Sequence, residues 1–99
     1  MKVFVSNSAY DDLEEIKKYY QREGAENVGV QIISSIIEHA QTLVDNPDIG
    51  RMVPEFGEER IRELIHSPFR VVYLREPESI HIIRIWRSER LLKLPESET

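Results

Sequence analysis

The chain of 99 residues has room for one small domain, because a chain of this length cannot enclose two hydrophobic cores. Hydrophobic residues make up 40% and charged residues 31%, a balance typical of folded globular domains, and the short apolar runs exclude a transmembrane helix. The formal net charge of -5 disfavours a protein that coats nucleic acid.

The first half of the sequence predicts a short strand followed by two helices. Residues 2–5 alternate and are rich in strand-forming side chains. Ser8 begins a capping-box pattern with Asp11, apolar residues then recur at helical spacing, and Gly24 is placed to end this first helix. A second helix is predicted over residues 25–45, where a following proline ends it. The two helices should form an antiparallel hairpin.

The second half changes to a strand pattern. Residues 47–59 contain prolines, glycines and charges and predict a connecting loop. Three strands are predicted at about 60–66, 69–75 and 79–87. The order β-α-α-β-β-β predicts an α+β fold in which the N-terminal helical hairpin packs on an antiparallel sheet. We expect one domain over residues 1–99, with a frayed tail from about 95 to 99.

The last two predicted strands should form a hairpin. If its two-residue turn is centred on Pro77 and the next residue, Tyr73 lies opposite Ile82. Continuing this register places Arg70 and Arg87 close together on one face, at one end of the sheet. Two neighbouring cations would favour water or an anionic partner between them.

Charge is distributed unevenly along the chain. Residues 1–50 carry four basic against nine acidic side chains, whereas residues 60–93 carry eight basic against four acidic. Eight of the nine arginines lie at or beyond residue 51. Arginines on strands can cover apolar surface with their stems, or they can form a surface that binds anions, and the sequence leaves both interpretations open.

The sequence contains few residues arranged for catalysis. It lacks cysteine, phosphate-binding glycine loops and the motifs of zinc proteases, and we expect no cofactor and no metal. The histidines, His39, His66 and His81, have no ligand spacing, and only His66, at a strand end, could serve as a general base. Glu63 is predicted to form an internal salt bridge. The N-terminus lacks the apolar stretch of a signal peptide, so we expect a cytoplasmic protein.

Three segments together resemble a known family. They are residues 61–65, the Phe-Arg-Val-Val-Tyr strand of residues 69–73, and residues 82–92, which contain Arg-Ile-Trp-Arg followed by a further arginine. Together with the helical hairpin, they are similar to the RelE/ParE superfamily of toxins from bacterial type II toxin–antitoxin modules. The resemblance covers nearly the whole chain. It implies a cognate antitoxin whose acidic, amphipathic C-terminal segment wraps the toxin, and allows for a toxin dimer within a hetero-oligomer.

The resemblance implies two alternative targets. RelE-like members cleave messenger RNA on the ribosome, and a ribonuclease built from this chain would use Arg70, His66, Arg87 and Arg90. ParE-like members poison DNA gyrase and have no established catalytic residues. The lysine pair of the ribonucleases is replaced by Ile61 and Glu63, and no tyrosine follows the tryptophan. A carboxylate at such a place opposes stabilisation of the transition state, which favours the ParE-like branch.

Three hypotheses follow. The first is a ParE-like gyrase poison that acts by binding, the second a ribosome-dependent endoribonuclease, and the third a degenerate toxin that only binds its antitoxin. In each case we expect no membrane contact. The residues predicted to bind the target or the antitoxin are Arg62, Arg70, Arg84, Trp86, Arg87 and Arg90.

Overall fold

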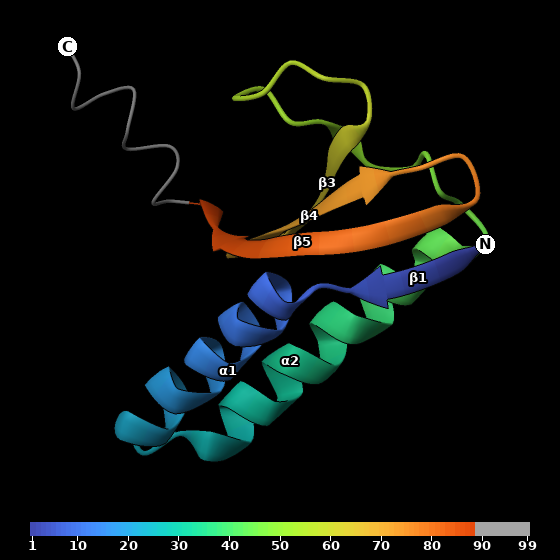
Figure 1. Ribbon diagram of the computed structural model, residues 1–99. Coiled ribbons are helices and arrows are strands. Elements are labelled where there is room, and N and C mark those ends of the chain that lie inside the picture. The colour runs from blue at the N-terminus through green and yellow to red at the C-terminus, as the bar shows by residue number, and fades with distance from the viewer. Residues whose placement is uncertain (89–99) are drawn as a thin grey trace, which may run out of the picture.

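The computed structural model describes residues 1–88 as two layers, with a helical hairpin packed on one face of a five-stranded sheet (Figure 1). The elements are β1 (Lys2–Val5), α1 (Asn7–Arg22), α2 (Glu26–Gln41), a 3-10 turn (Thr42–Val44), β2 (Arg51–Met52), β3 (Ile61–His66), β4 (Phe69–Arg75) and β5 (Ser79–Arg87). The predicted α+β class and the order of the main elements are confirmed. The predicted tail, residues 95–99, lies outside the described residues.

The helical hairpin begins two residues earlier than predicted. The N-cap of α1 is Ser6, whose Oγ accepts a hydrogen bond from the backbone N–H of Ala9 at 3.2 Å, so the prediction of Ser8 was wrong. Gly24 has a φ of +72°, which allows the tight turn into α2. The two helices approach closely at Gly29, where an added Cβ would lie 2.8 Å from Cβ of Tyr20.

The second helix ends sooner than predicted. Its regular hydrogen bonding stops at Gln41, and the chain tightens into the 3-10 turn before it reaches Pro47. Leu43 in this turn is fully buried, so the tighter winding places an apolar side chain in the core. This short segment also brings the chain beside β1, where the N-terminal amino group donates to the carbonyl of Val44 at 3.3 Å.

The sheet has the strand order β1-β5-β4-β3-β2 and is mixed rather than antiparallel. The antiparallel strands β3, β4 and β5 occupy the predicted ranges almost residue for residue. Two pairings were not predicted. Strand β1 runs parallel to β5, with Lys2 opposite Ser79. The short strand β2, which lies inside the predicted loop, pairs with the start of β3.

A β-bulge divides the β4–β5 hairpin. Next to the turn the register is as predicted, with Tyr73 opposite Ile82. Between Val72 and Tyr73 the register shifts by one residue, so that Arg70 lies opposite Trp86 and Phe69 lies opposite Arg87. The prediction that Arg70 and Arg87 share a face is therefore wrong: the extra residue of β5 places the two arginines on opposite faces.

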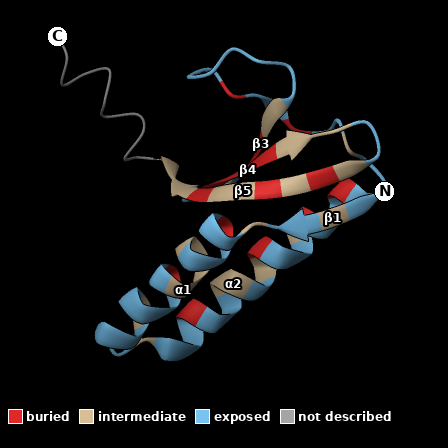
Figure 2. Ribbon diagram, in the orientation of Figure 1, coloured by how far each residue is buried: buried red, intermediate tan, exposed pale blue. Residues whose placement is uncertain are grey.

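The hydrophobic core lies between the helices and the sheet. Figure 2 shows the buried residues on the sides of the helices and strands that face each other, while the outer sides of the helices are exposed. The core is formed chiefly by Ala9, Ile16, Ile36, Ala40, Leu43, Leu64, Phe69, Val71, Tyr73, Ile80, Ile82 and Ile85. Strand β4 is central and buried on both faces, because residues 53–59 contact the face that lies away from the helices.

Candidate functional site: an arginine-lined cleft beside β5

Among residues 1–88, half of β5 has no neighbouring strand on the side of α1. Strand β1 pairs only with Ser79–Ile82, and the edge of β5 beyond Ile82 faces the first turns of α1. Asp12 on α1 takes the place of a strand partner, because its Oδ2 accepts from the backbone N–H of Ile85 at 2.9 Å. The same carboxylate accepts two hydrogen bonds from Arg84, at 2.8 and 3.1 Å. These bonds raise the pKa of the Arg84 guanidinium.

Asp12 therefore fixes the position of α1 on the sheet. Replacing Asp12 with alanine should lower the free energy of unfolding by about 1 kcal/mol, because the Ile85 N–H loses its partner and Arg84 loses its anion. Urea denaturation measures this change. Asp11→Ala is the matched control, since Asp11 is exposed and its loss should change stability by less than about 0.5 kcal/mol. Equal costs for the two variants would contradict the role of Asp12.

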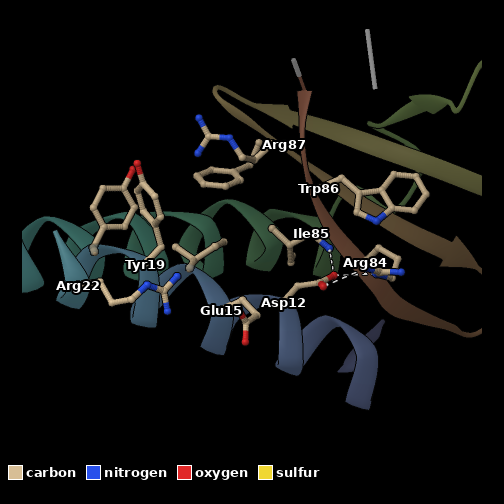
Figure 3. Close-up of a pocket in the computed structure, with 11 residues that line it drawn as sticks. Asp12, Glu15, Tyr19, Arg22, Arg84, Ile85, Trp86 and Arg87 are labelled. Carbon is tan, nitrogen blue, oxygen red and sulfur yellow. Dashed lines mark hydrogen bonds and ion pairs between the residues drawn. The ribbon is translucent and has the colours of Figure 1, made fainter. Parts of the chain in front are cut away.

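A cleft with a volume of about 570 Å³ runs between α1 and the second half of β5 (Figure 3). Its lining residues are Asp12, Glu15, Ile16, Tyr19, Tyr20, Arg22, Phe69, Arg84, Ile85, Trp86 and Arg87. Three of the predicted binding residues, Arg84, Trp86 and Arg87, line this cleft around the edge of β5, with Trp86 on the face of Arg70 and Arg87 on the face of Phe69. The other contributions, from α1, were not predicted, since the acidic and tyrosine residues of this helix carry no signal that distinguishes a cleft wall from a solvated face.

The cleft combines cations with aromatic rings. The guanidinium of Arg84 lies 5.4 Å from the ring centre of Trp86, and that of Arg87 lies 5.5 Å from the ring centre of Phe69. On the other face of the sheet Trp86 contacts Phe56, with the ring centres 6.2 Å apart. Such stacking holds the guanidinium groups in place, and arginine and tryptophan are the residue types that most often dominate binding energy at protein interfaces.

Arg70 lies elsewhere, in an ion-pair cluster on the face opposite the helices. Arg70 is only 4% exposed; its Nε donates to buried Glu63, and its two terminal nitrogens donate to Glu55 at 2.9 Å each. Glu63 also accepts from Arg51 at 2.6 Å, so the predicted internal salt bridge of Glu63 is confirmed. The hydrogen bonds with Glu55 raise the pKa of Arg70 and lower the pKa of Glu55.

This ion-pair cluster holds the loop of residues 53–59 in place and does not line the cleft. By binding Glu55, Arg70 holds residues 53–59 against the sheet. The prediction that Arg70 binds a target or an antitoxin stays a prediction, but in the folded chain its guanidinium is already engaged by two carboxylates.

The remaining predicted site residues are dispersed. Arg62 donates from Nη1 to the carbonyl of Gly50 at 2.9 Å and lies outside the cleft lining. His66 contacts His39 and Ser35 of α2 instead of the cleft. Arg90 lies outside the described residues. The residues expected in a ribonuclease are therefore not assembled within residues 1–88: Arg70 and Arg87 occupy opposite faces, and His66 is bound to α2.

Two kinds of site are absent from residues 1–88. No group of three or more histidine, cysteine, aspartate or glutamate side chains is arranged to hold a metal ion. No helix in this part of the chain combines the length and apolarity needed to cross a membrane.

A helical hairpin over one face of a small mixed sheet is the architecture of the RelE/ParE toxins, as the sequence resemblance predicted. A family model described as ParE toxin of type II toxin-antitoxin system, parDE, matches residues 3–92. A solved structure titled "Chromosomal ParDE TA system from P. aeruginosa" superposes with a TM-score of 0.72 and 26% sequence identity, covering 88% of this chain and 95% of that chain. No curated protein matches the sequence. The chain belongs to the ParE toxin family of type II toxin–antitoxin systems.

Proposed function

We propose that this ParE-family toxin blocks replication in the cytoplasm by binding DNA gyrase and that a cognate antitoxin neutralises it. The observation that carries the proposal is the gathering of Arg84, Trp86 and Arg87 in one cleft, while the residues of a ribonuclease are dispersed. A cleft lined by cations and aromatic rings suits the binding of a macromolecule. Catalysis by proton transfer would need a base within hydrogen-bonding distance of a reacting group.

The proposed antitoxin segment is acidic and amphipathic. Acidic side chains would complement Arg22, Arg84 and Arg87, and apolar side chains would contact the aromatic rings between them. If the antitoxin covers this cleft, it excludes gyrase by occupying the same residues. Toxicity and antitoxin binding should then be lost together in variants of the cleft.

The test uses purified chain, purified gyrase and supercoiled DNA. We expect the chain to trap gyrase on cleaved DNA, and we expect Trp86→Ala and Arg87→Glu to weaken this effect about tenfold or more, as for central aromatic and arginine residues of interfaces. Arg60→Glu is the control, because this side chain is 61% exposed and lies outside the cleft lining. Circular dichroism checks that each variant is folded.

Expression without antitoxin separates this proposal from its alternatives. A gyrase poison should give filamentous cells with damaged DNA and intact messenger RNA. Unchanged gyrase activity together with discrete cuts in translated messengers would instead identify a ribosome-dependent endoribonuclease. Normal growth, with antitoxin binding retained, would identify a degenerate binding module.

A further inference from the structure

Arg70 does not line the cleft, yet it lies directly beside a residue that does. In the β4–β5 pairing it is opposite Trp86, and the side chains of paired residues share one face of the sheet. That face lies away from the helices, and Figure 3 shows the side chains of Trp86 and Arg87 on opposite sides of β5. The position of the Trp86 indole therefore depends on the loop of residues 53–59, which contacts this face.

The loop is anchored to the sheet at two points. The first is Val53, which is fully buried and donates its N–H to the carbonyl at the start of β3 at 3.1 Å. The carbonyl of Val53 accepts from the N–H groups of Phe56 and Gly57, and the φ of +63° at Gly57 allows the chain to turn here. The second point is Glu55, whose carboxylate accepts from both terminal nitrogens of Arg70. Such a bidentate pair fixes the direction of the carboxylate as well as its distance.

The anchored carboxylate also determines where the next side chain lies. Phe56 follows Glu55 directly, and its ring centre is 6.2 Å from that of Trp86, within the range of about 4.5–7 Å that aromatic pairs favour. The guanidinium of Arg84 lies 5.4 Å from the same indole. Because Phe56 is 47% exposed, packing restrains its ring only in part. The ion pair at the preceding residue supplies the remaining restraint.

We propose that Arg70 is a positioning residue for gyrase binding, because it holds the indole of Trp86 in place without contacting the target. It acts through Glu55 and Phe56, and we call these three residues the brace. The inference rests on the gyrase-binding function proposed above. It agrees with the engagement of the Arg70 guanidinium by two carboxylates. An indole that is already held in place loses less conformational freedom on binding, so the brace raises affinity without adding a contact.

The position of Trp86 can be measured in the free chain, because it is the single tryptophan of the sequence. Glu55→Gln removes the charge that Arg70 holds, and Phe56→Ala removes the ring. Both variants should show stronger acrylamide quenching of tryptophan fluorescence and lower fluorescence anisotropy, with the circular dichroism spectrum of the folded chain retained. A role in stability alone would lower Tm and leave the quenching of the folded chain unchanged.

Two further variants serve as controls for the fluorescence measurement. Phe56→Tyr keeps an aromatic ring beside the indole and should match the unsubstituted chain. Glu59→Gln removes an exposed carboxylate from the same loop and should also leave the quenching unchanged. Arg70→Lys keeps the charge but lacks the planar fork that holds Glu55, so its quenching should resemble that of Glu55→Gln.

The same variants are then tested for trapping of purified gyrase on cleaved DNA. The chain concentration for half-maximal trapping should rise roughly two- to tenfold in Glu55→Gln and in Phe56→Ala, the range expected for the loss of one aromatic pair. The double variant should be no weaker than Phe56→Ala alone, because Glu55 acts through Phe56.

The outcomes separate the brace from the function on which it rests. If the unsubstituted chain traps gyrase and Glu55→Gln equals it in both quenching and trapping, the brace alone is overturned. The same holds if the losses of Glu55→Gln and Phe56→Ala multiply in the double variant, since the two residues would then act independently. A chain that does not trap gyrase at all would overturn both proposals.

Discussion

Replacing Glu63 with alanine is expected to lower the free energy of unfolding by about 3–5 kcal/mol, the largest single effect we predict. Glu63 is 1% exposed and accepts hydrogen bonds from Arg70 and Arg51. Without it, the buried Arg70 loses one of its two anions, and the loop that carries Glu55 loses part of its attachment. Urea denaturation monitored by circular dichroism gives the change in unfolding free energy.

Arg51→Ala is the control for this prediction. The Arg51 side chain is 60% accessible, so removing this partner of Glu63 should lower the free energy of unfolding by less than about 1 kcal/mol. Glu63→Gln keeps the side-chain volume and removes the charge, so its cost in unfolding free energy should lie between the costs of Glu63→Ala and Arg51→Ala. A Glu63→Ala cost no greater than that of Arg51→Ala would show that the buried position of the carboxylate does not matter.

Gly50→Ala should destabilise the fold by about 3 kcal/mol, the upper end of the usual cost of overpacking. A Cβ here would lie 2.6 Å from Oη of Tyr73 and 2.7 Å from the carbonyl oxygen of Glu63. The Tyr73 hydroxyl accepts from the N–H of Gly50 and donates to the carbonyl of Pro47, both at 3.0 Å, so it cannot move without losing hydrogen bonds. Burial raises the pKa of Tyr73 and keeps the hydroxyl protonated for this donation.

Gly24→Ala provides the comparison for Gly50→Ala. Gly24 has a positive φ and open space around its missing side chain, so alanine there should cost only about 1 kcal/mol for the unfavourable backbone conformation. Thermal or urea unfolding of both variants separates a packing cost from a conformational cost. If Gly50→Ala proves the milder of the two, the close approach of Tyr73 is not what restricts residue 50.

Local patterns were sufficient to predict the main helices and strands. The helical spacing of apolar residues in the first half and the strand-forming runs after residue 60 report directly on local periodicity. The bounds of β3, β4 and β5 agree with the predicted ranges to within a residue. The predicted start of α1 was wrong because Ser6 and Ser8 are both good N-cap residues, and which of them caps the helix depends on a distant contact. Ser6 also donates to the carbonyl of Ile83.

Features that depend on distant segments could not be predicted. The bulge at Val72 belongs to the pairing of two strands, and it moved Arg70 away from Arg87. The contact of Asp12 with Ile85 was not predicted, because nothing in α1 shows that the edge of β5 lies beside it. Within the candidate site, residue type singled out Arg84, Trp86 and Arg87, which line one cleft, and their binding role stays a prediction.

The parallel pairing of β1 with β5 also affects when the molecule becomes complete during synthesis. Residues 2–5 leave the ribosome first, yet their partners are residues 79–82, so β1 has no strand to join until nearly all described residues have been made. Contacts between such distant segments make folding slow. The cleft also depends on this late segment, because α1 on one side is synthesised early and β5 on the other side is synthesised late. A nascent chain that stops before β5 has no cleft, and the proposed target surface exists only on the finished molecule.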